Sequence, residues 1–390
     1  MSVRVIGLMS GTSLDGIDAA LVRFDGDVGA LDWTLDAFVS SAYPAERRRA
    51  IFDAIEKGDG PSLCLLHARL GDWLADAALA VCAAAGVQPP AVDLIGSHGQ
   101  TVWHEPPTRD RRGATLQLGC PATIAERTGI DVVSDFRTRD VAAGGHGAPL
   151  VPWADRYLFA VPGRTRVLLN IGGIANLTRV PPRGSDDPLF AFDTGPGNAL
   201  IDAAVELATG GARRYDADGQ MARRGTVDEV LLGSLLAHPF HEAVPPKSTG
   251  REVFGRPFVA SLARDHGFPD RRRWDDLVAT LTALTARGIG DALRRWVVPR
   301  GVDEVVVTGG GARNPVLLEW LREALAPIPV IDGRSAGIDP DAKEAIAFAG
   351  LAWAHVHGVP GNMAEATGAA GPRVLGSFTP GARTGARFGG

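Results

Sequence analysis

The chain has 390 residues, 45% of them apolar and 22% charged, which is enough for two globular domains with sizeable cores. The formal net charge of −5 argues against a general nucleic-acid or membrane-surface binder, because no basic excess is available to neutralise phosphates. The three cysteines are scattered and form no CxxC pair, and an apolar strand pattern begins at once. We therefore expect a cytoplasmic protein without a disulfide scaffold.

The first third of the chain predicts strands, a glycine-rich turn and a long helix. Strands are expected at 3–9, 18–24 and 35–41. An amphipathic helix follows Pro61, with Ser62 as its cap and Gly86 at its end, and its charged residues exclude a membrane span. The run VDLIGSHGQTVWHEP indicates a buried strand that leads into a polar loop, and GIDVVSDF indicates another strand.

The same pattern starts again at Arg166. RVLLNIGGIANLTRV predicts a second glycine-turned hairpin, and LFAFDTGPGNALIDAAVELATGG predicts a strand, a turn and a helix. Later elements are a helix from Asp275, a helix capped by Asn314 with Pro315 first, a final helix at 340–357 and a frayed tail from Pro372. Two similar α/β halves in tandem predict a ligand-binding cleft between them.

Three glycine-rich turns are candidate phosphate-binding loops, because glycine allows close approach and successive N–H groups form an anion-binding concavity. The candidate residues are Gly11, Thr12, Ser13, Leu14, Asp15, Gly16, Ile17, Asp18, Gly172, Gly173, Gly309, Gly310 and Gly311. Asp15 or Asp18 could hold Mg²⁺ through water. The structural alternative for each turn is a plain hairpin or strand–helix link. Neither a P-loop nor a dinucleotide-binding glycine fingerprint is present in the sequence.

Asp193 is the candidate catalytic carboxylate. It is expected to end the strand LFAF, beside the Gly195–Gly197 turn and a helix N-terminus, where it could accept a proton from a hydroxyl or water. The alternative is that Asp193 only caps the turn through local backbone hydrogen bonds. A neighbouring phosphate site favours catalysis, since phosphoryl transfer needs a group that orients the nucleophile.

Four further residues are candidates for substrate contact. His98 and Gln100 are expected just past a strand end, lining a pocket. Arg137 could pair with an anionic substrate group or form a structural ion pair. Glu344 opens the final helix beside Lys343, where both could also be a solvated first turn. His238 and His241 are three apart but have no evident third ligand, which argues against zinc.

Taken together, nine motifs resemble one family from about residue 5 to 375. They are GLMSGTSLDGIDAAL, SHGQTVWHEP, SDFRTRDVAAGGHGAPLVP, LNIGGIANLT, FDTGPGNALID, PPKSTGREVF, DLVATLTALTA, VVVTGGGARNP and DAKEAIAFAGLAW. In this order they resemble the anhydro-N-acetylmuramic acid kinases. His146 stands where this family usually has glutamine, and Met9-Ser10 stands where many sugar kinases have an aspartate.

The resemblance implies the actin, Hsp70 and sugar-kinase fold, with two ribonuclease-H-like α/β domains around an ATP cleft. The implied domains are 1–135 with about 358–390, and 136–357. The implied reaction joins ATP, water and 1,6-anhydro-N-acetylmuramic acid to give ADP and N-acetylmuramic acid 6-phosphate, a step in recycling cell-wall sugars. Mg²⁺ and a homodimer are implied as well.

The resemblance also assigns roles. Asp193 would deprotonate a water that attacks the anomeric carbon, and the departing O6 would attack the γ-phosphate. The segment Gly11–Asp18 would bind ATP, Gly309–Gly311 would contact adenosine, and Arg137 and Glu344 would contact the sugar. Two other hypotheses remain open: a conventional sugar kinase without ring hydrolysis, and a non-catalytic, ATP-switched protein like actin or a chaperone.

Overall fold

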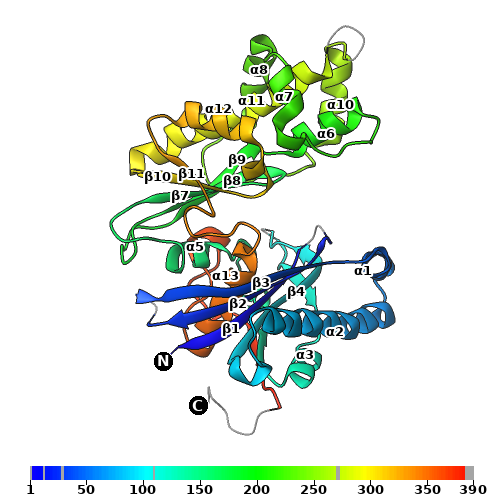
Figure 1. The fold of residues 1–390 in the computed structure, drawn as a ribbon, viewed down its shortest axis with the longest axis vertical. Coiled ribbons are helices and arrows are strands. Elements are labelled where there is room, and N and C mark those ends of the chain that lie inside the picture. The colour runs from blue at the N-terminus through cyan, green and yellow to red at the C-terminus, as the bar shows by residue number, and fades with distance from the viewer. Residues whose placement is uncertain (1, 12–13, 28–29, 109, 269–272, 383–390) are drawn as a thin grey trace. The chain divides into compact units, whose positions relative to one another are not determined.

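A computed structural model describes residues 2–11, 14–27, 30–108, 110–268 and 273–382. The chain divides into two compact units (Figure 1). Unit 1 comprises Met1–Phe159 and Asp341–Gly390, and unit 2 comprises Ala160–Pro340. Residues 136–159 and 341–357, expected in the second domain, belong to unit 1. The reason is that helix α13 (Lys343–Val356) packs on strands β1 (Val3–Ser10) and β4 (Leu94–Glu105).

The described residues of unit 1 form a seven-stranded sheet in the order β12-β6-β4-β1-β2-β3, with β5 paired to β4. Its remaining strands are β2 (Gly16–Asp25), β3 (Asp32–Ala42), β5 (Ala114–Leu118), β6 (Asp131–Ser134) and β12 (Ser377–Thr379). β2 is antiparallel to β1 and β3, whereas β4 is parallel to β1 and β6. The three strands expected at the start of the chain are confirmed.

Unit 2 repeats this arrangement in a five-stranded sheet of order β11-β10-β7-β8-β9. Its strands are β7 (Arg166–Ile171), β8 (Ile174–Val180), β9 (Phe190–Pro196), β10 (Glu304–Thr308) and β11 (Val330–Asp332). Again the first three strands form an antiparallel meander, and the fourth and fifth run parallel to the first. This order in both units is that of a ribonuclease-H-like domain, so the expected fold class is confirmed.

Helices cover both faces of the sheet in unit 1 (Figure 1). They are α1 (Ala45–Lys57), α2 (Gly60–Ala84), α3 (Pro121–Thr128), α4 (Thr138–Ala142), α5 (Pro152–Tyr157), α13 and α14 (Ala364–Thr367). Ile6 and Leu8 of β1 share a buried cluster with α1, α2 and α3. Because strand side chains alternate, Gly7 faces the opposite side, where α13 lies. A Cβ on Gly7 would overlap Ala345 O, so glycine permits this close approach.

In unit 2, α11 (Trp274–Ala292) and α12 (Pro315–Leu325) pack on the sheet through one buried cluster. A second cluster joins α11 to a group of shorter helices. These are α6 (Ala199–Ala208), α7 (Gln220–Arg224), α8 (Glu229–Leu236) and α10 (Arg256–Asp265); α9 (Pro239–Glu242) follows α8. Within the described residues, no helix combines the length and apolar character that a membrane crossing requires.

Several local expectations need correction. The cap of α2 is Asp59, whose carboxylate accepts from the Ser62 N–H at 2.7 Å, so Ser62 lies inside the first turn. The tail from Pro372 is not simply frayed, because β12 pairs with β6. The helix expected at 340–357 begins later, at Lys343, and it is not the last, because α14 follows it. The cap at Asn314 is confirmed: its Oδ1 accepts from the Val316 and Leu317 N–H groups.

Candidate active site

Three buried polar side chains support the turn between β1 and β2 through hydrogen bonds. Tyr43 lies 2.9 Å from Ser10, the Ser10 hydroxyl donates to Gln100 Oε1 at 2.6 Å, and Gln100 Nε2 donates to Gly11 O at 3.2 Å. Burial raises the pKa of Tyr43 to about 12, so it remains a neutral hydroxyl. Gln100 therefore uses both ends of its amide within the protein. It supports the turn rather than lining an open pocket.

The predicted residues of this first turn divide into two groups. Leu14 and Ile17 are buried in the core of unit 1, so only their main-chain groups could meet a ligand. Asp15 is exposed and Asp18 half-buried. The pKa of Asp18 is raised chiefly by burial, with Asp341 and Asp15 adding to the effect. Thr12 and Ser13 lie outside the described residues.

His98 and Arg137 form a directional pair in unit 1. Arg137 Nε donates to His98 Nε2 at 2.9 Å, and His98 Nδ1 donates to Gly99 O at 2.8 Å, which fixes one neutral tautomer. Burial, reinforced by the Arg137 charge, lowers the pKa of His98 to about 3. His98 is thus a neutral acceptor that orients the guanidinium and cannot act as a proton donor at neutral pH.

The expectation that His98 and Gln100 follow a strand end is wrong, since β4 continues to Glu105. The second half of β4 is stabilised by pairing with β5, from Gln100 opposite Leu118 to Glu105 opposite Ala114. This partner strand has only five residues, ATLQL, and gave no clear signal in the sequence. Both side chains are thereby held on a strand rather than on a loop.

Glu344 lies in the first turn of α13 and completes the polar group of unit 1. The surrounding protein raises its pKa by burial, an effect that the charges of Lys343 and Arg137 partly offset. Lys343 is not solvated: its Nζ lies 2.8 Å from Asp155 Oδ1, with both side chains largely buried. Glu344 and half-buried Arg137 are close enough for their charges to interact.

In unit 2 the second and third glycine turns lie together. A Cβ on Gly309 would lie 2.5 Å from Asn170 Oδ1 and 2.8 Å from Ile171 O, at the end of β7 that leads into Gly172–Gly173. Gly310 is exposed and Gly311 is buried against Ile171. The carbonyls of Gly172 and Gly173 accept from the N–H groups of residues 197–199, at 2.8 to 3.0 Å.

The turn also has main-chain donors available. Among the described residues, no hydrogen bond from the N–H of Gly172 or Gly173 to another protein group is present. Free N–H groups in a glycine turn are suited to hold an anion. At the N-terminal end of α6, in contrast, the N–H groups of residues 197–199 already donate to the carbonyls of the turn.

Asp193 lies inside β9 rather than at its end, opposite Asn176 on β8. The strand continues to Pro196. Asp193 pairs with Asn176 of β8, but the neighbouring residue of β8, Ala175, pairs with Gly195, so a bulge in β9 follows Asp193 directly. Bulges of this kind re-aim side chains and are frequent next to active sites. The end of this strand was predicted from the apolar run LFAF. Pairing with β8 extends β9 beyond that run.

The segment Lys247–Thr249 orients the Asp193 carboxylate. Asp193 N–H donates to Lys247 O at 3.0 Å, and Thr249 N–H donates to Asp193 Oδ2 at 2.9 Å. Lys247 Nζ donates to Phe240 O at 2.8 Å and His241 O at 3.2 Å, which anchors the segment on α9. Burial raises the pKa of Asp193, partly offset by the Thr249 bond. Among the residues that the structure describes, no hydrogen bond to Asp193 Oδ1 is present.

Arg251 was missed in the sequence. Its guanidinium lies over the second glycine turn, since a Cβ on Gly173 would be 3.2 Å from both Arg251 Nε and Nη2. Burial raises the pKa of nearby Asp202 to about 6, and the Arg251 charge opposes this shift. The motif PPKSTGREVF could have indicated this arginine, because this motif places one of the three lysines of the chain close to Arg251. Arg251 places an exposed cation beside the free N–H groups.

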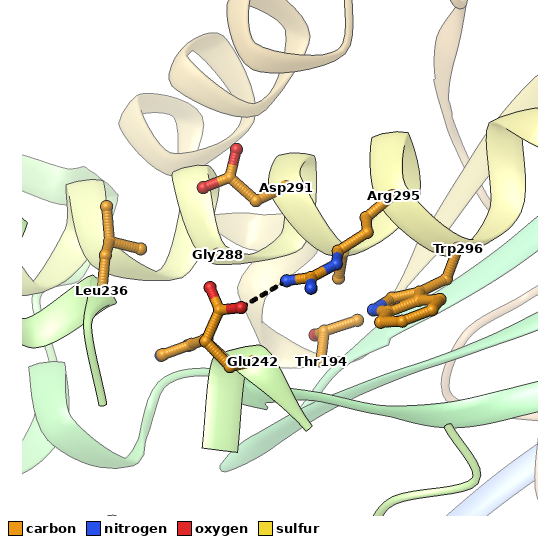
Figure 2. A pocket seen from close by; sticks show the side chains of 9 residues that line it. Thr194, Leu236, Glu242, Gly288, Asp291, Arg295 and Trp296 are labelled. Atoms are coloured by element: carbon orange, nitrogen blue, oxygen red, sulfur yellow. Dashed lines mark hydrogen bonds and ion pairs between the residues drawn. The ribbon is translucent and has the colours of Figure 1, made fainter. Parts of the chain in front are cut away.

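A small pocket of about 60 Å³ lies between β9 and α11 (Figure 2). Thr194, Asp291, Arg295 and Trp296 line it, and Arg295 pairs with Glu242 at 2.7 Å. Thr194 lines the pocket together with Gly288 and Asp291 of α11. Ligand pockets usually span about 300–1,000 Å³, so this cavity is too small for a nucleotide or sugar. It contains none of the predicted site residues.

No group of three or more histidine, cysteine, aspartate or glutamate side chains suited to a metal ion exists in the described part of the chain. Mg²⁺ is different, because it keeps several waters and needs only one or two carboxylates besides substrate phosphates. Exposed Asp15, with Asp18 on the same hairpin, fits that limited requirement.

One protein family matches the chain over nearly its full length. The family model described as anhydro-N-acetylmuramic acid kinase matches residues 3–381. The enzyme of that name from Caldanaerobacter subterraneus subsp. tengcongensis is 44% identical, over 96% of this chain and 96% of its own. That from Ralstonia nicotianae is 46% identical, over 97% and 98%.

Among solved structures, (R)-2-hydroxyglutaryl-CoA dehydratase component A from Acidaminococcus fermentans aligns at 13% identity with a TM-score of 0.44. The alignment covers 90% of this chain and 98% of that one. A likeness this distant carries no argument about function. The family match and the two full-length relatives are sufficient by themselves: the chain belongs to the anhydro-N-acetylmuramic acid kinase family.

Proposed function

We propose that this kinase opens the ring of 1,6-anhydro-N-acetylmuramic acid with water and phosphorylates O6 from ATP, with the residue roles given below. Membership of the family across residues 3–381 carries the proposal of the substrate. In the reaction, water oxygen bonds to C1 and the C1–O6 bond breaks. O6 then bonds to the γ-phosphorus, the bond from that phosphorus to the β–γ bridging oxygen breaks, and ADP leaves.

Asp193 is the proposed general base. The Thr249 N–H holds Oδ2, which leaves Oδ1 to take the proton of the attacking water. Burial brings the pKa of Asp193 above its usual value, which makes the carboxylate a better base than an exposed one. The segment Lys247–Thr249 keeps its direction fixed, as a positioned base requires.

The polar side chains His98, Arg137 and Glu344 of unit 1 form the proposed sugar site. Arg137, oriented by neutral His98, presents the remaining N–H groups of its guanidinium to an acceptor such as the carboxylate of the muramic acid. Glu344 is close enough to influence Arg137 and can accept from a sugar hydroxyl. Gln100 is assigned to support of the first turn instead.

The three glycine turns are the proposed ATP contacts. The main-chain groups of Gly11–Asp18 and of Gly172–Gly173 would hold phosphate oxygens, and exposed Gly310 would approach the adenosine. Arg251 would neutralise charge that develops during phosphoryl transfer. Mg²⁺, which we propose is held by Asp15 and Asp18 through water, neutralises phosphate charge when bound.

We also propose a homodimer in the cytoplasm, in keeping with the implied recycling of cell-wall sugars. Analytical ultracentrifugation measures the first directly: a sedimentation mass near twice 40.9 kDa is expected, and a concentration-independent mass near 40.9 kDa would contradict it. Fractionation of the native host tests the location, which is wrong if the protein is recovered outside the cytoplasm.

The experiment for the proposed function is an ADP-release assay with Mg-ATP and a small set of sugars. We expect turnover with 1,6-anhydro-N-acetylmuramic acid and none above background with N-acetylmuramic acid or N-acetylglucosamine. Equal or faster turnover with N-acetylglucosamine would favour the conventional sugar kinase. ADP release that no sugar changes would favour the ATP-switched protein.

A further inference from the structure

Asp140 is a fully buried carboxyl group in unit 1 that the proposed reaction does not use. Its Oδ2 accepts from the Gly147 N–H at 2.8 Å. Its Oδ1 accepts from Asn362 Nδ2 at 2.8 Å and from the Thr367 hydroxyl at 2.7 Å. All three donors are neutral, and Asn362 and Thr367 are more than 220 residues away in sequence. Aspartate is almost never buried unless paired, so this geometry requires a specific reason.

The Gly147 contact links Asp140 to the proposed sugar site. Gly147 O accepts from Arg137 Nη1 at 2.6 Å, while Arg137 Nε donates to His98. The guanidinium is therefore held at two points, by His98 and by Gly147. Asp140 holds the same glycine through its N–H. A loss of the Asp140 contact would free Gly147, the residue whose carbonyl is one of the two acceptors of Arg137.

A C-terminal segment, residues 362–373, completes the connection. His146 N–H donates to Thr367 O at 2.7 Å, and Ala370 N–H donates to Ala143 O at 2.9 Å. The Arg373 N–H donates to Asn362 Oδ1 at 2.6 Å, which fixes the Asn362 amide so that Nδ2 faces Asp140. The loop 143–147 is thus attached to this segment by main-chain bonds and by the Asp140 carboxyl.

We propose that Asp140, with Asn362 and Thr367, is a positioning group that sets the Arg137 guanidinium for the sugar. The inference rests on the proposed function, in which Arg137 contacts substrate. In this arrangement the C-terminal segment contributes to sugar binding without touching the sugar. Its effect passes through one residue, Gly147, and not through the ATP-binding turns.

The primary variant is Asp140→Asn, which has one acceptor oxygen where the carboxyl has two. We expect the KM for the sugar to rise about 10- to 100-fold, the range of a lost hydrogen bond to a charged group, with the KM for ATP within about twofold. The double variant Asp140→Asn/Asn362→Asp restores the contact between the two side chains, because the new amide accepts from Gly147 and donates to the carboxylate introduced by the second change. The bond from Asn362 Nδ2 to Gly371 O is lost in this variant. Its sugar KM should return to within a few-fold of the parent value.

A double-mutant cycle separates positioning from general support. If Asp140 acts through Arg137, Arg137→Ala/Asp140→Asn should have the same sugar KM as Arg137→Ala alone. Additive effects of the two changes would overturn the inference. An Arg137→Ala variant with unchanged sugar KM would instead refute the proposed role of Arg137, so the two failures are distinguishable.

A milder pair keeps the test valid if Asp140→Asn does not fold. Thr367→Val removes one hydroxyl donor at nearly constant volume, and Thr367→Ser restores it. We expect a several-fold higher sugar KM for the valine variant only, with ATP affinity unchanged in both. An unchanged sugar KM in a folded Thr367→Val protein, or equal changes for sugar and ATP, would contradict the inference.

Discussion

The hairpins β1–β2 and β7–β8 occupy the same place in two sheets of the same strand order, but their turns are supported differently. In unit 1 the support comes from side chains, namely Ser10, Tyr43 and Gln100. In unit 2 it comes mainly from the main chain, through N–H groups of residues 197–199 that donate to Gly172 and Gly173. The same scaffold therefore tolerates two ways of fixing a glycine turn.

The chemistry of the two units differs in a corresponding way. Unit 1 gathers His98, Arg137 and Glu344, whose pKa values are all shifted toward the neutral form by burial. Unit 2 carries one oriented carboxylate, Asp193, and an exposed cation, Arg251. A binding role suits the first group and a proton-transfer role the second, so changes in the two units should affect different kinetic constants.

The largest expected effect is that of Asp193→Asn in unit 2. Loss of a positioned base should reduce kcat by about 10²- to 10⁴-fold, with nucleotide binding retained. Steady-state ADP release and nucleotide titration measure this, with exposed Asp186→Asn as the matched control. In the parent enzyme kcat/KM should fall as the pH drops through the raised pKa of Asp193. A variant that keeps a tenth or more of its kcat would refute the assigned base.

Gly7→Ala should destabilise unit 1 by about 1–3 kcal/mol, because its Cβ overlaps the Ala345 carbonyl oxygen and α13 must move. The matched control is Gly233→Ala at an exposed position of α8, where no atom lies within 4 Å of an added Cβ. Since alanine favours a helix over glycine, the control should be neutral or stabilising by about 0.5–1 kcal/mol. Urea denaturation compares the two, and equal stability would show that α13 is not tightly packed on β1.

Asp202→Asn should stabilise unit 2 in a pH-dependent manner. The folded pKa of about 6 exceeds the ordinary 3.8, so wild-type Asp202 contributes stability below pH 3.8 that is lost as the pH rises through 6. Asparagine does not titrate. The Tm of the variant relative to wild type should therefore increase between pH 4 and pH 8, by about 2–4 °C for each kcal/mol. A Tm difference that is constant over this range contradicts the burial of Asp202.

The smallest effect, and the direct test of the two kinds of turn support, is Tyr43→Phe against Thr285→Val. Tyr43 bonds Ser10 below the first turn, whereas the Thr285 hydroxyl donates to Gly197 O at 2.8 Å beside main-chain bonds that remain. We expect the KM for ATP to rise about 2- to 10-fold for Tyr43→Phe, the range of one net hydrogen bond, and less for Thr285→Val. The reverse order would show that side chains matter more in unit 2.

Local patterns in the sequence were sufficient for much of the fold. The apolar runs of β1 and β2, the turns that join them and that join β7 to β8, and the Asn314–Pro315 helix start depend on neighbouring residues, and all were predicted. Asp193 could be singled out because an acidic residue beside Gly195–Gly197 is a local pattern. The kinetics of Asp193→Asn test its predicted role as the general base.

Features that depend on distant pairing could not be predicted. β4 continues past Gln100 only because β5 pairs with it, and β12 forms only because β6 offers an edge. The role of Gln100 as a support for Gly11 O follows from a contact between residues 89 positions apart. The Asp140 group, which joins residues more than 220 positions apart, likewise has no local signature.

The most direct test of the central claim, ring opening by water at a kinase site, is turnover in ¹⁸O-water. The product is quenched and analysed by mass spectrometry at once, before mutarotation exchanges the anomeric oxygen. We predict one ¹⁸O atom per product at the anomeric carbon and none in the bond between O6 and phosphorus. A product without label at the anomeric carbon would contradict the hydrolytic mechanism and leave a conventional phosphoryl transfer to a free hydroxyl.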